Sequence, residues 1–264
     1  MKVILAGDDG SRAAALAVEW ALRLAKERGA LCKVVGATRD DDMAPSVDGG
    51  DDGVERIMVR DSHPASAILA TAEEVDADLI VLGRRGSGGF PSLPIGTTAH
   101  AVAAATDRPT VIVPTPPPGS GDPLVQRVVV GLDGLPGSAD AARWAARQWP
   151  DAQFVAAHAL ELAPSFAQIT DEASTGLYER AHARALELVN EWWVRPLRDA
   201  GASFDTVVED GGPAEVLLSV AARTSADLLV VGRRDHHLLR GTLGGVSQRV
   251  LAYSPCPALM VPSS

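Results

Sequence analysis

The chain contains one strand-and-turn framework twice, and this duplication limits its fold more than any other feature. The first apolar run with its turn, residues 4–10, recurs as residues 128–134, so that Asp9 corresponds to Asp133. The other matched segments keep the same order: Glu19-Trp20-Ala21 with Arg143-Trp144-Ala145, Pro64-Ala65 with Pro213-Ala214, Ala77-Asp78-Leu79 with Ala226-Asp227-Leu228, Gly83-Arg84-Arg85 with Gly232-Arg233-Arg234, and 108–114 with 256–262. So many anchors in one order indicate an internal repeat.

The offset between matched residues shows where the two copies differ. It is 124 residues at Asp9 and Asp133 but 149 residues at Gly83 and Gly232, so the second copy has gained about 25 residues. The gain falls on residues 169–200, whose apolar side chains recur at helical spacing and predict one long amphipathic helix. These apolar side chains are Leu177, Ala181, Ala185, Leu188 and Trp192. In the first copy, residues 39–53 are too few and too rich in Asp and Gly for such a helix.

The order of apolar patterns predicts the fold class. Short runs of Val, Ile and Leu alternate with Ala-rich helical patterns, as at 12–28, 65–75 and 97–105, which is typical of parallel sheets covered on both faces. We therefore predict an α/β architecture of two tandem doubly wound, Rossmann-like domains, the first lacking one helix. The predicted boundaries are 1–116 for the first domain, 117–125 for a linker rich in Pro and Gly, and 126–264 for the second domain.

Charge and hydropathy exclude several functional classes. The formal net charge of −10 opposes general binding to nucleic acid, because phosphate backbones need a basic surface. No apolar run approaches the roughly 18 to 20 residues that span a bilayer, and the chain begins with a strand rather than a signal peptide. We expect a cytoplasmic protein that does not bind membranes. Cys32 and Cys256 occupy non-equivalent positions, which favours buried thiols over a disulfide or a metal site.

A glycine-rich loop in the first copy indicates an anion-binding site. Gly83-Arg84-Arg85-Gly86 follows a buried run, and after nine further residues Gly96-Thr97 opens a helical pattern. Glycine lets a backbone N–H approach an anion closely, and a helix beginning at Thr97 would add unpaired donors and the positive end of a dipole. The pattern therefore predicts a phosphate-binding turn, with a plain surface loop as the alternative.

Asp9 and Asp133 end the first strand of their copies, where open α/β sheets place ligands. Such an aspartate could accept a hydrogen bond from an adenine amino group or a ribose hydroxyl. It could equally cap the helix that follows. Its recurrence in both copies favours at least a common structural role.

Three segments together resemble the universal stress protein family: Ala6-Gly7-Asp8-Asp9-Gly10-Ser11, the G-x-x-G-x9-G-T loop and the closing Pro-Thr-Val-Ile-Val-Pro run. Nearly the whole chain resembles a tandem pair of such domains. The resemblance implies that ATP binds with Mg²⁺, which is held mainly by phosphate oxygens. The residues that it assigns to the nucleotide, the first two to adenosine and the rest to ribose and phosphates, are Asp9, Ala37, Gly83, Arg85, Gly86, Gly96 and Thr97. It also implies an internal pseudo-dimer in which the two closing strands face one another, and it leaves a homodimer open.

The two copies are expected to differ in function. The second has Gly232-Arg233-Arg234-Asp235, with a carboxylate in place of the second glycine, and Gly244-Gly245 in place of Gly-Thr. A carboxylate a few ångströms from a triphosphate repels it by about 1 kcal/mol or more even at high dielectric constant. The missing helix of the first copy removes only a wall near the adenosine. We therefore expect one nucleotide site per chain, in the first domain, and a second domain that is mainly structural or partner-binding.

Three further features have structural explanations. His236-His237 lacks the spacing of metal ligands on a helix, and we expect a solvated loop. The acidic run at 40–52 does not match a calcium-binding loop, and it too is expected to be solvated. Trp192-Trp193 is expected to pack within the helix at 169–200 rather than to form a stacking platform.

The motifs favour binding over catalysis. The chain lacks G-x-x-x-x-G-K-[ST], G-x-G-x-x-G and G-x-S-x-G, and we identify no catalytic or metal-binding residue. We expect an ATP-binding stress-response or regulatory protein, a nucleotide-dependent sensor whose occupancy alters a surface recognised by an unknown protein partner. The alternatives are a slow ATP-hydrolysing or nucleotidyl-transferring enzyme and a nucleotide-free interaction scaffold.

Overall fold

The first domain contains most of its helices where the sequence predicts them. The computed structural model describes residues 1–38, 46–49, 54–61, 63–86, 93–115, 123–161, 172–233 and 243–263. The elements of the first domain are β1 (Val3–Gly7), α1 (Arg12–Arg28), β2 (Leu31–Thr38), β3 (Ser46–Gly49), β4 (Glu55–Arg60), α2 (Pro64–Glu74), β5 (Leu79–Gly83), α3 (Thr97–Ala105) and β6 (Thr110–Val113). The helices predicted at 12–28 and 97–105 coincide with α1 and α3, and the one at 65–75 differs from α2 by one residue at each end.

The second domain repeats this order with an insertion. Its elements are β7 (Arg127–Gly131), α4 (Pro136–Gln148), β8 (Gln153–Leu160), α5 (Glu172–Leu188), the π-helix η2 (Val189–Trp193), α6 (Arg195–Asp199), β9 (Ser203–Asp210), α7 (Pro213–Arg223), β10 (Leu228–Gly232), α8 (Gly245–Tyr253) and β11 (Ala258–Val261). The segment α5-η2-α6 lies between β8 and β9, whereas in the first domain the short strand β3 lies between β2 and β4. Among the described residues between β2 and β4 of the first domain there is no helix, in agreement with the prediction.

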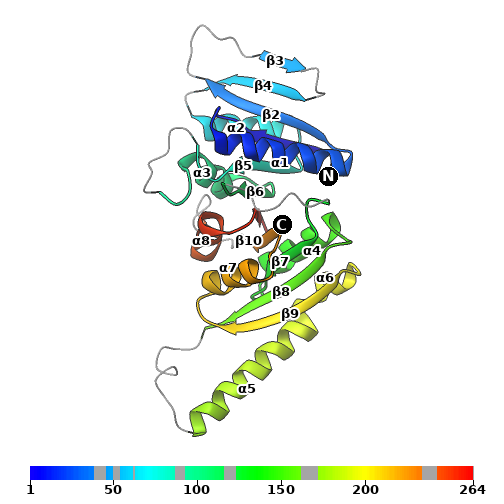
Figure 1. The fold of residues 1–264 in the computed structure, drawn as a ribbon, viewed down its shortest axis with the longest axis vertical. Helices are drawn as coiled ribbons and strands as arrows, with labels where there is room; N and C mark the ends of the chain where they lie inside the picture. Colours follow the sequence, from blue (N-terminus) through cyan, green and yellow to red (C-terminus); the bar gives the residue numbers. More distant parts are fainter. Residues whose placement is uncertain are drawn as a thin grey trace.

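All described strands join one open sheet that runs through both domains. The order is β3-β4-β2-β1-β5-β6-β11-β10-β7-β8-β9. Within it, β3 pairs with β4 and β6 pairs with β11 in antiparallel fashion, and the other neighbouring pairs are parallel. Figure 1 shows the sheet along the length of an elongated molecule, with α5 projecting beyond β9 at the far end. The predicted class, two tandem doubly wound parallel sheets, is confirmed.

The closing strands of the two domains pair directly, as the sequence predicts. In the antiparallel pair of β6 and β11, Val111 lies opposite Leu259. One arginine of each domain also forms a hydrogen bond across this junction. Arg84 donates to the backbone carbonyl of Ser254, and its counterpart Arg233 donates to that of Thr106 and contacts Asp107 Oδ1 at 3.2 Å. The reciprocal bonds follow the pseudo-twofold relation between the domains.

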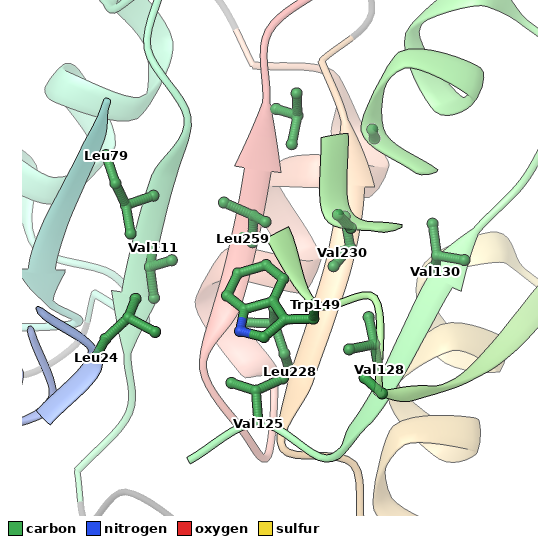
Figure 2. Packing of buried hydrophobic residues seen from close by; sticks show 14 of the residues in the cluster. Leu24, Leu79, Val111, Val125, Val128, Val130, Trp149, Leu228, Val230 and Leu259 are labelled. Carbon is green, nitrogen blue, oxygen red and sulfur yellow. The ribbon is translucent and has the colours of Figure 1, made fainter. Parts of the chain in front are cut away.

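The hydrophobic core is continuous across the junction. Alternate strand residues face opposite sides, and one buried cluster includes residues of α1, α4, α5 and α6, while the other includes residues of α2, α3, α7 and α8. Figure 2 shows Val111 of β6 beside Leu259 of β11, with Trp149 packed over the second domain's strands. Cys32 and Cys256 are buried free thiols, as predicted. The exact domain boundaries stay predictions, because residues 116–122 lie outside the described chain.

The prediction of a single long helix at 169–200 is wrong. Pro196 is in the first turn of α6 and cannot donate a backbone hydrogen bond, so the helix divides there after the π-helical turn η2. The predicted apolar stripe is also only partly buried. Leu177 and Trp192 remain 45% and 53% exposed. The buried contacts of this segment come mainly from Ala185, Val189, Val194 and Leu197.

Candidate functional site

The first domain has its topological switch point between β1 and β5. From β1 the chain passes through α1 to β2 on one side, and it returns through α2 to β5 on the other side. Since α1 and α2 pack on opposite faces of the sheet, the turns after β1 and β5 diverge and leave a crevice at the carboxyl ends of the strands. The sequence places Asp8, Asp9 and Gly10 on one side of this crevice and the loop beginning at Gly83 on the other.

The turn after β1 is held by its own aspartates. Asp8 Oδ1 accepts from Gly10 N at 2.9 Å, and Asp9 Oδ1 accepts from Ser11 N at 3.0 Å. Ser11 caps α1 by accepting from Ala14 N at 3.1 Å, so Asp9 does not cap the helix. Asp133 makes the same turn in the second domain, where its Oδ1 accepts from Leu135 N at 3.0 Å. The common structural role expected for the two aspartates is this turn.

The glycines of the loop after β5 lie where a side chain would collide. A Cβ on Gly83 would lie 2.8 Å from Ala13 O in the first turn of α1. A Cβ on Gly86 would overlap Asp9 Oδ2 and lie 3.2 Å from Asp9 Cγ. The two sides of the crevice therefore meet at Asp9 and Gly86, and any side chain at position 86 would have to displace the Asp9 carboxylate.

Arg84 and Arg85 are neighbours in sequence but have different environments. Arg84 reaches away from the crevice to Ser254 in the other domain, and burial of its guanidinium, together with the charge of Arg85, lowers the pKa of Arg84. Arg85 is exposed and lines the crevice. Arg85 is therefore the cation of this loop that can meet an anionic ligand.

The loop ends at an open helix N-terminus. Gly96 is the N-cap residue of α3 and has no side chain to bond the first amides of the helix. Gly96 itself is held by a hydrogen bond from its N–H to Arg84 O at 2.8 Å. Thr97, Thr98 and Ala99, which form the first turn, all line the crevice. Such a turn offers backbone donors and the positive end of the helix dipole to an anion.

The crevice is a cavity of about 890 Å³. All seven residues assigned to the nucleotide line it: Asp9, Ala37, Gly83, Arg85, Gly86, Gly96 and Thr97. Ala37 lies near the end of β2, opposite Val59 of β4. The structure thus brings together residues from three strand ends and one helix start, in a cavity within the size range of small-molecule sites.

Sequence reasoning missed one wall of the cavity. This wall is one face of β2 and β4, and its residues are Val34, Gly36, Arg56 and Met58. In the second domain, the equivalent face of the sheet packs on α5-η2-α6. The missing helix therefore leaves space that belongs to the cavity. Arg56 carries no sequence signal of this role, because its position depends on what covers β4.

The corresponding part of the second domain is only partly described. Asp235 and His236-His237 lie outside the described residues, so the expectations about them stay predictions. Most of the acidic run also lies outside them, but the expectation of a loop is wrong for Asp48, which lies in β3 opposite Arg56 of β4. Within the described part of the chain, no group of three or more His, Cys, Asp or Glu side chains could hold a metal ion. Among the same residues, no helix has both the length and the apolar character needed to cross a bilayer.

The comparison with protein families agrees with this architecture. The Universal stress protein family matches residues 42–114 and 125–262, once in each domain. A universal stress protein from Methanocaldococcus jannaschii is 28% identical over 154 residues, which cover 54% of this chain and 85% of that protein. Another, from Thermus aquaticus, is 32% identical over 112 residues, which cover 42% of this chain and 77% of that protein.

Solved structures show the same fold over the whole chain. A functionally unknown protein from Pseudomonas aeruginosa PAO1 aligns with a TM-score of 0.71 at 13% identity, covering 100% of this chain and 93% of its own. A universal stress protein from Archaeoglobus fulgidus aligns with a TM-score of 0.65 at 17% identity, covering 99% and 98%. At such low identity the likeness supports the fold alone.

Proposed function

Because this chain belongs to the universal stress protein family, we propose that it is a nucleotide-binding stress protein whose first domain binds an adenine nucleotide. ATP is the expected form. The observation that carries this proposal is the cavity at the switch point, where the turn after β1 meets an open helix N-terminus across a glycine loop. Asp9 and Ala37 are assigned to adenosine, and the loop from Gly83 to Thr97 to ribose and phosphates.

The phosphate end of the cavity combines three kinds of donor. The first-turn amides of α3 point out of the helix, Arg85 supplies a cation, and Thr97 supplies a hydroxyl. Each suits phosphate oxygens, and local donors are needed because the chain as a whole is strongly acidic. For Mg²⁺ we propose that phosphate oxygens supply most of the ligands. The cavity also offers the hard oxygens of Thr97 and Asp9.

We further propose that nucleotide occupancy is sensed at the domain junction by a protein partner in the cytoplasm. Arg84 and Arg85 are consecutive, and the first bonds the other domain while the second lines the cavity. Movement of the loop on nucleotide binding would therefore alter the hydrogen bond between Arg84 and Ser254. This linkage supports a regulatory role, and a homodimer would add a second such surface.

Calorimetric titration of the full chain with adenosine, AMP, ADP and ATP tests the proposal. Asp9→Ala should weaken all four ligands, because it acts on the nucleoside. Arg85→Ala should leave adenosine unchanged and weaken ATP, by about 1.5 to 3 kcal/mol for a lost hydrogen bond to a charged group. Arg147→Ala, on the exposed side of α4, is the matched control and should change nothing. Absence of binding at millimolar ATP, or an equal effect of Arg85→Ala on adenosine, would refute the assignment.

A further inference from the structure

Strand register relates the two domains residue by residue at the ends of their first strands. Gly7 of β1 pairs with Val35 of β2, and Gly131 of β7 pairs with Ala157 of β8. The next amide repeats the relation, since Asp8 N donates to Val35 O and Leu132 N donates to Ala157 O, both at 2.9 Å. It follows that Gly10 corresponds to Gly134 and that Gly36 corresponds to His158.

Gly10 and Gly134 occupy the same turn but face different surroundings. Their φ angles are +74° and +76°. In the first domain, no atom of the described chain lies within 4 Å of the Cβ position of Gly10, which lines the cavity. In the second domain, Cε2, Nε1 and Cζ2 of Trp193 lie 2.6, 2.7 and 2.8 Å from the Cβ position of Gly134. The indole of Trp193 thus lies against the backbone of Gly134, whereas the equivalent space beside Gly10 in the first domain is part of the cavity.

The other side of the indole is also fixed. The Trp193 ring meets the His158 ring edge to face, with centroids 4.8 Å apart and an interplanar angle of 76°. His158 Nδ1 lies 2.8 Å from Leu132 O, which anchors that ring to the turn after β7. Residues equivalent to Gly10 and Gly36, both cavity residues in the first domain, therefore contact a half-buried aromatic side chain from two sides in the second.

The helix that delivers the indole has an unusual form. Trp193 is the last residue of η2, a five-residue π-helical turn between α5 and α6. A π-turn inserts a residue into the helical repeat, and such turns are rare and frequent at functional sites. Here the insertion directs Trp193 toward Gly134, whereas Trp192 remains 53% exposed with Arg195 over its ring at 4.6 Å.

We propose that Trp193 is an intramolecular ligand of the second domain, whose indole occupies a second base-binding site and keeps it closed to a purine. Indole and purine are both flat, fused two-ring systems, so the enclosure that His158 and Gly134 form around one has the shape to accept the other. Asp133, which directly precedes Gly134, holds the same turn as Asp9 does in the first domain. The choice of a purine rests on the function proposed for the first domain.

Titration of the full chain with adenosine tests this inference, using Trp193→Ala, the adjacent Trp192→Ala as control, and the unmodified chain. Adenosine is the probe because Asp235 follows β10 in the sequence and would repel phosphates. Removing an enclosed ring leaves a cavity that can bind a ligand of similar shape. We expect Trp193→Ala to bind one more adenosine per chain than the unmodified chain, and Trp192→Ala to bind no more.

The outcomes separate this inference from the function of the first domain. If the unmodified chain binds no adenosine but Trp193→Ala binds one, the first-domain proposal fails and this inference stands. If a folded Trp193→Ala gains no site, the inference is overturned. If Trp193→Ala does not fold, Trp193→Leu is used in its place, because leucine keeps part of the apolar volume at η2. The melting temperature of the variant is a second measurement, because a ligand that binds the folded state must raise it. If neither adenosine nor free indole raises that temperature, the inference is also overturned.

Discussion

Replacing Gly86 by Asp should remove measurable nucleotide binding without unfolding the protein. Gly86 is exposed, and the atom that a new Cβ would overlap, Asp9 Oδ2, belongs to a side chain that can rotate away. The fold should therefore tolerate the change. The binding site should not, because the new carboxylate enters the phosphate end of the cavity next to a second carboxylate.

The expected magnitude follows from the geometry. The loss of affinity comes from repulsion between the new carboxylate and the nucleotide phosphates. Like charges about 4 Å apart repel by about 1 kcal/mol in bulk water and about 4 kcal/mol near a protein surface. Each 1.4 kcal/mol is a factor of ten in affinity, so one such contact with a phosphate weakens ATP binding between about 5-fold and 1,000-fold. The new Cβ would also lie 3.2 Å from Asp9 Cγ, and repulsion between these two carboxylates acts on the free chain as well, so it lowers stability rather than affinity.

Two further variants separate charge from shape. Gly86→Ala moves Asp9 but adds no charge, so its smaller loss should not change with salt, whereas part of the loss in Gly86→Asp should shrink as salt screens it. Gly212→Asp is the matched control. A Cβ there would overlap Glu215 Oε2 and lie 3.2 Å from Glu215 Cδ, in the second domain and away from the cavity. Calorimetric affinity for ATP in Gly86→Asp within about 3-fold of the unmodified chain would refute the reasoning.

Three other expectations follow from the same structure. Arg84→Ala and Arg233→Ala each remove a charged donor from a backbone carbonyl across the domain junction, and each should lower the free energy of unfolding in urea by about 1.5 to 3 kcal/mol; unchanged midpoints would show that the junction does not depend on them. Burial raises the pKa of Cys32 and Cys256 to about 11. Unfolded thiols therefore ionise first, and stability should fall as the pH rises from about 9 to 11, by at most about 3 kcal/mol per thiol; the double alanine variant should lose less in the same urea series. Asp235→Gly should leave the affinity of the first domain for ATP unchanged by calorimetry, and weaker binding would place Asp235 in that site.

The glycine-loop end of the cavity was predictable because its requirements are local. Gly83 is needed where two backbones approach, Gly86 lies against the Asp9 carboxylate, and Gly96-Thr97 opens a helix, so the spacing in the sequence reports the geometry directly. The order of apolar runs likewise predicted α1, α2 and α3, because each helix buries one stripe against the sheet. These features depend on residues close together in the chain.

The opposite wall was not predictable, because it depends on distant packing. Arg56 lines the cavity where none of the described helices covers β4, and nothing near Arg56 in the sequence signals this exposure. Apolar periodicity predicted Trp192 on the buried stripe, but the π-turn η2 shifts the repeat by one residue and turns Trp193 inward instead. We expected the loss of this helix from the first domain to remove only a wall. In the second domain, the helical segment α5-η2-α6 fills the space that is part of the cavity in the first domain.

We expect the first domain to hold a single adenine nucleotide per chain. Native mass spectrometry of the full chain with ATP and Mg²⁺ can establish this, because it counts the nucleotides bound to each molecule. It should show one nucleotide per chain, which is lost in Gly86→Asp and retained in Gly212→Asp. A chain that binds none, or that fills two sites equally, would contradict it.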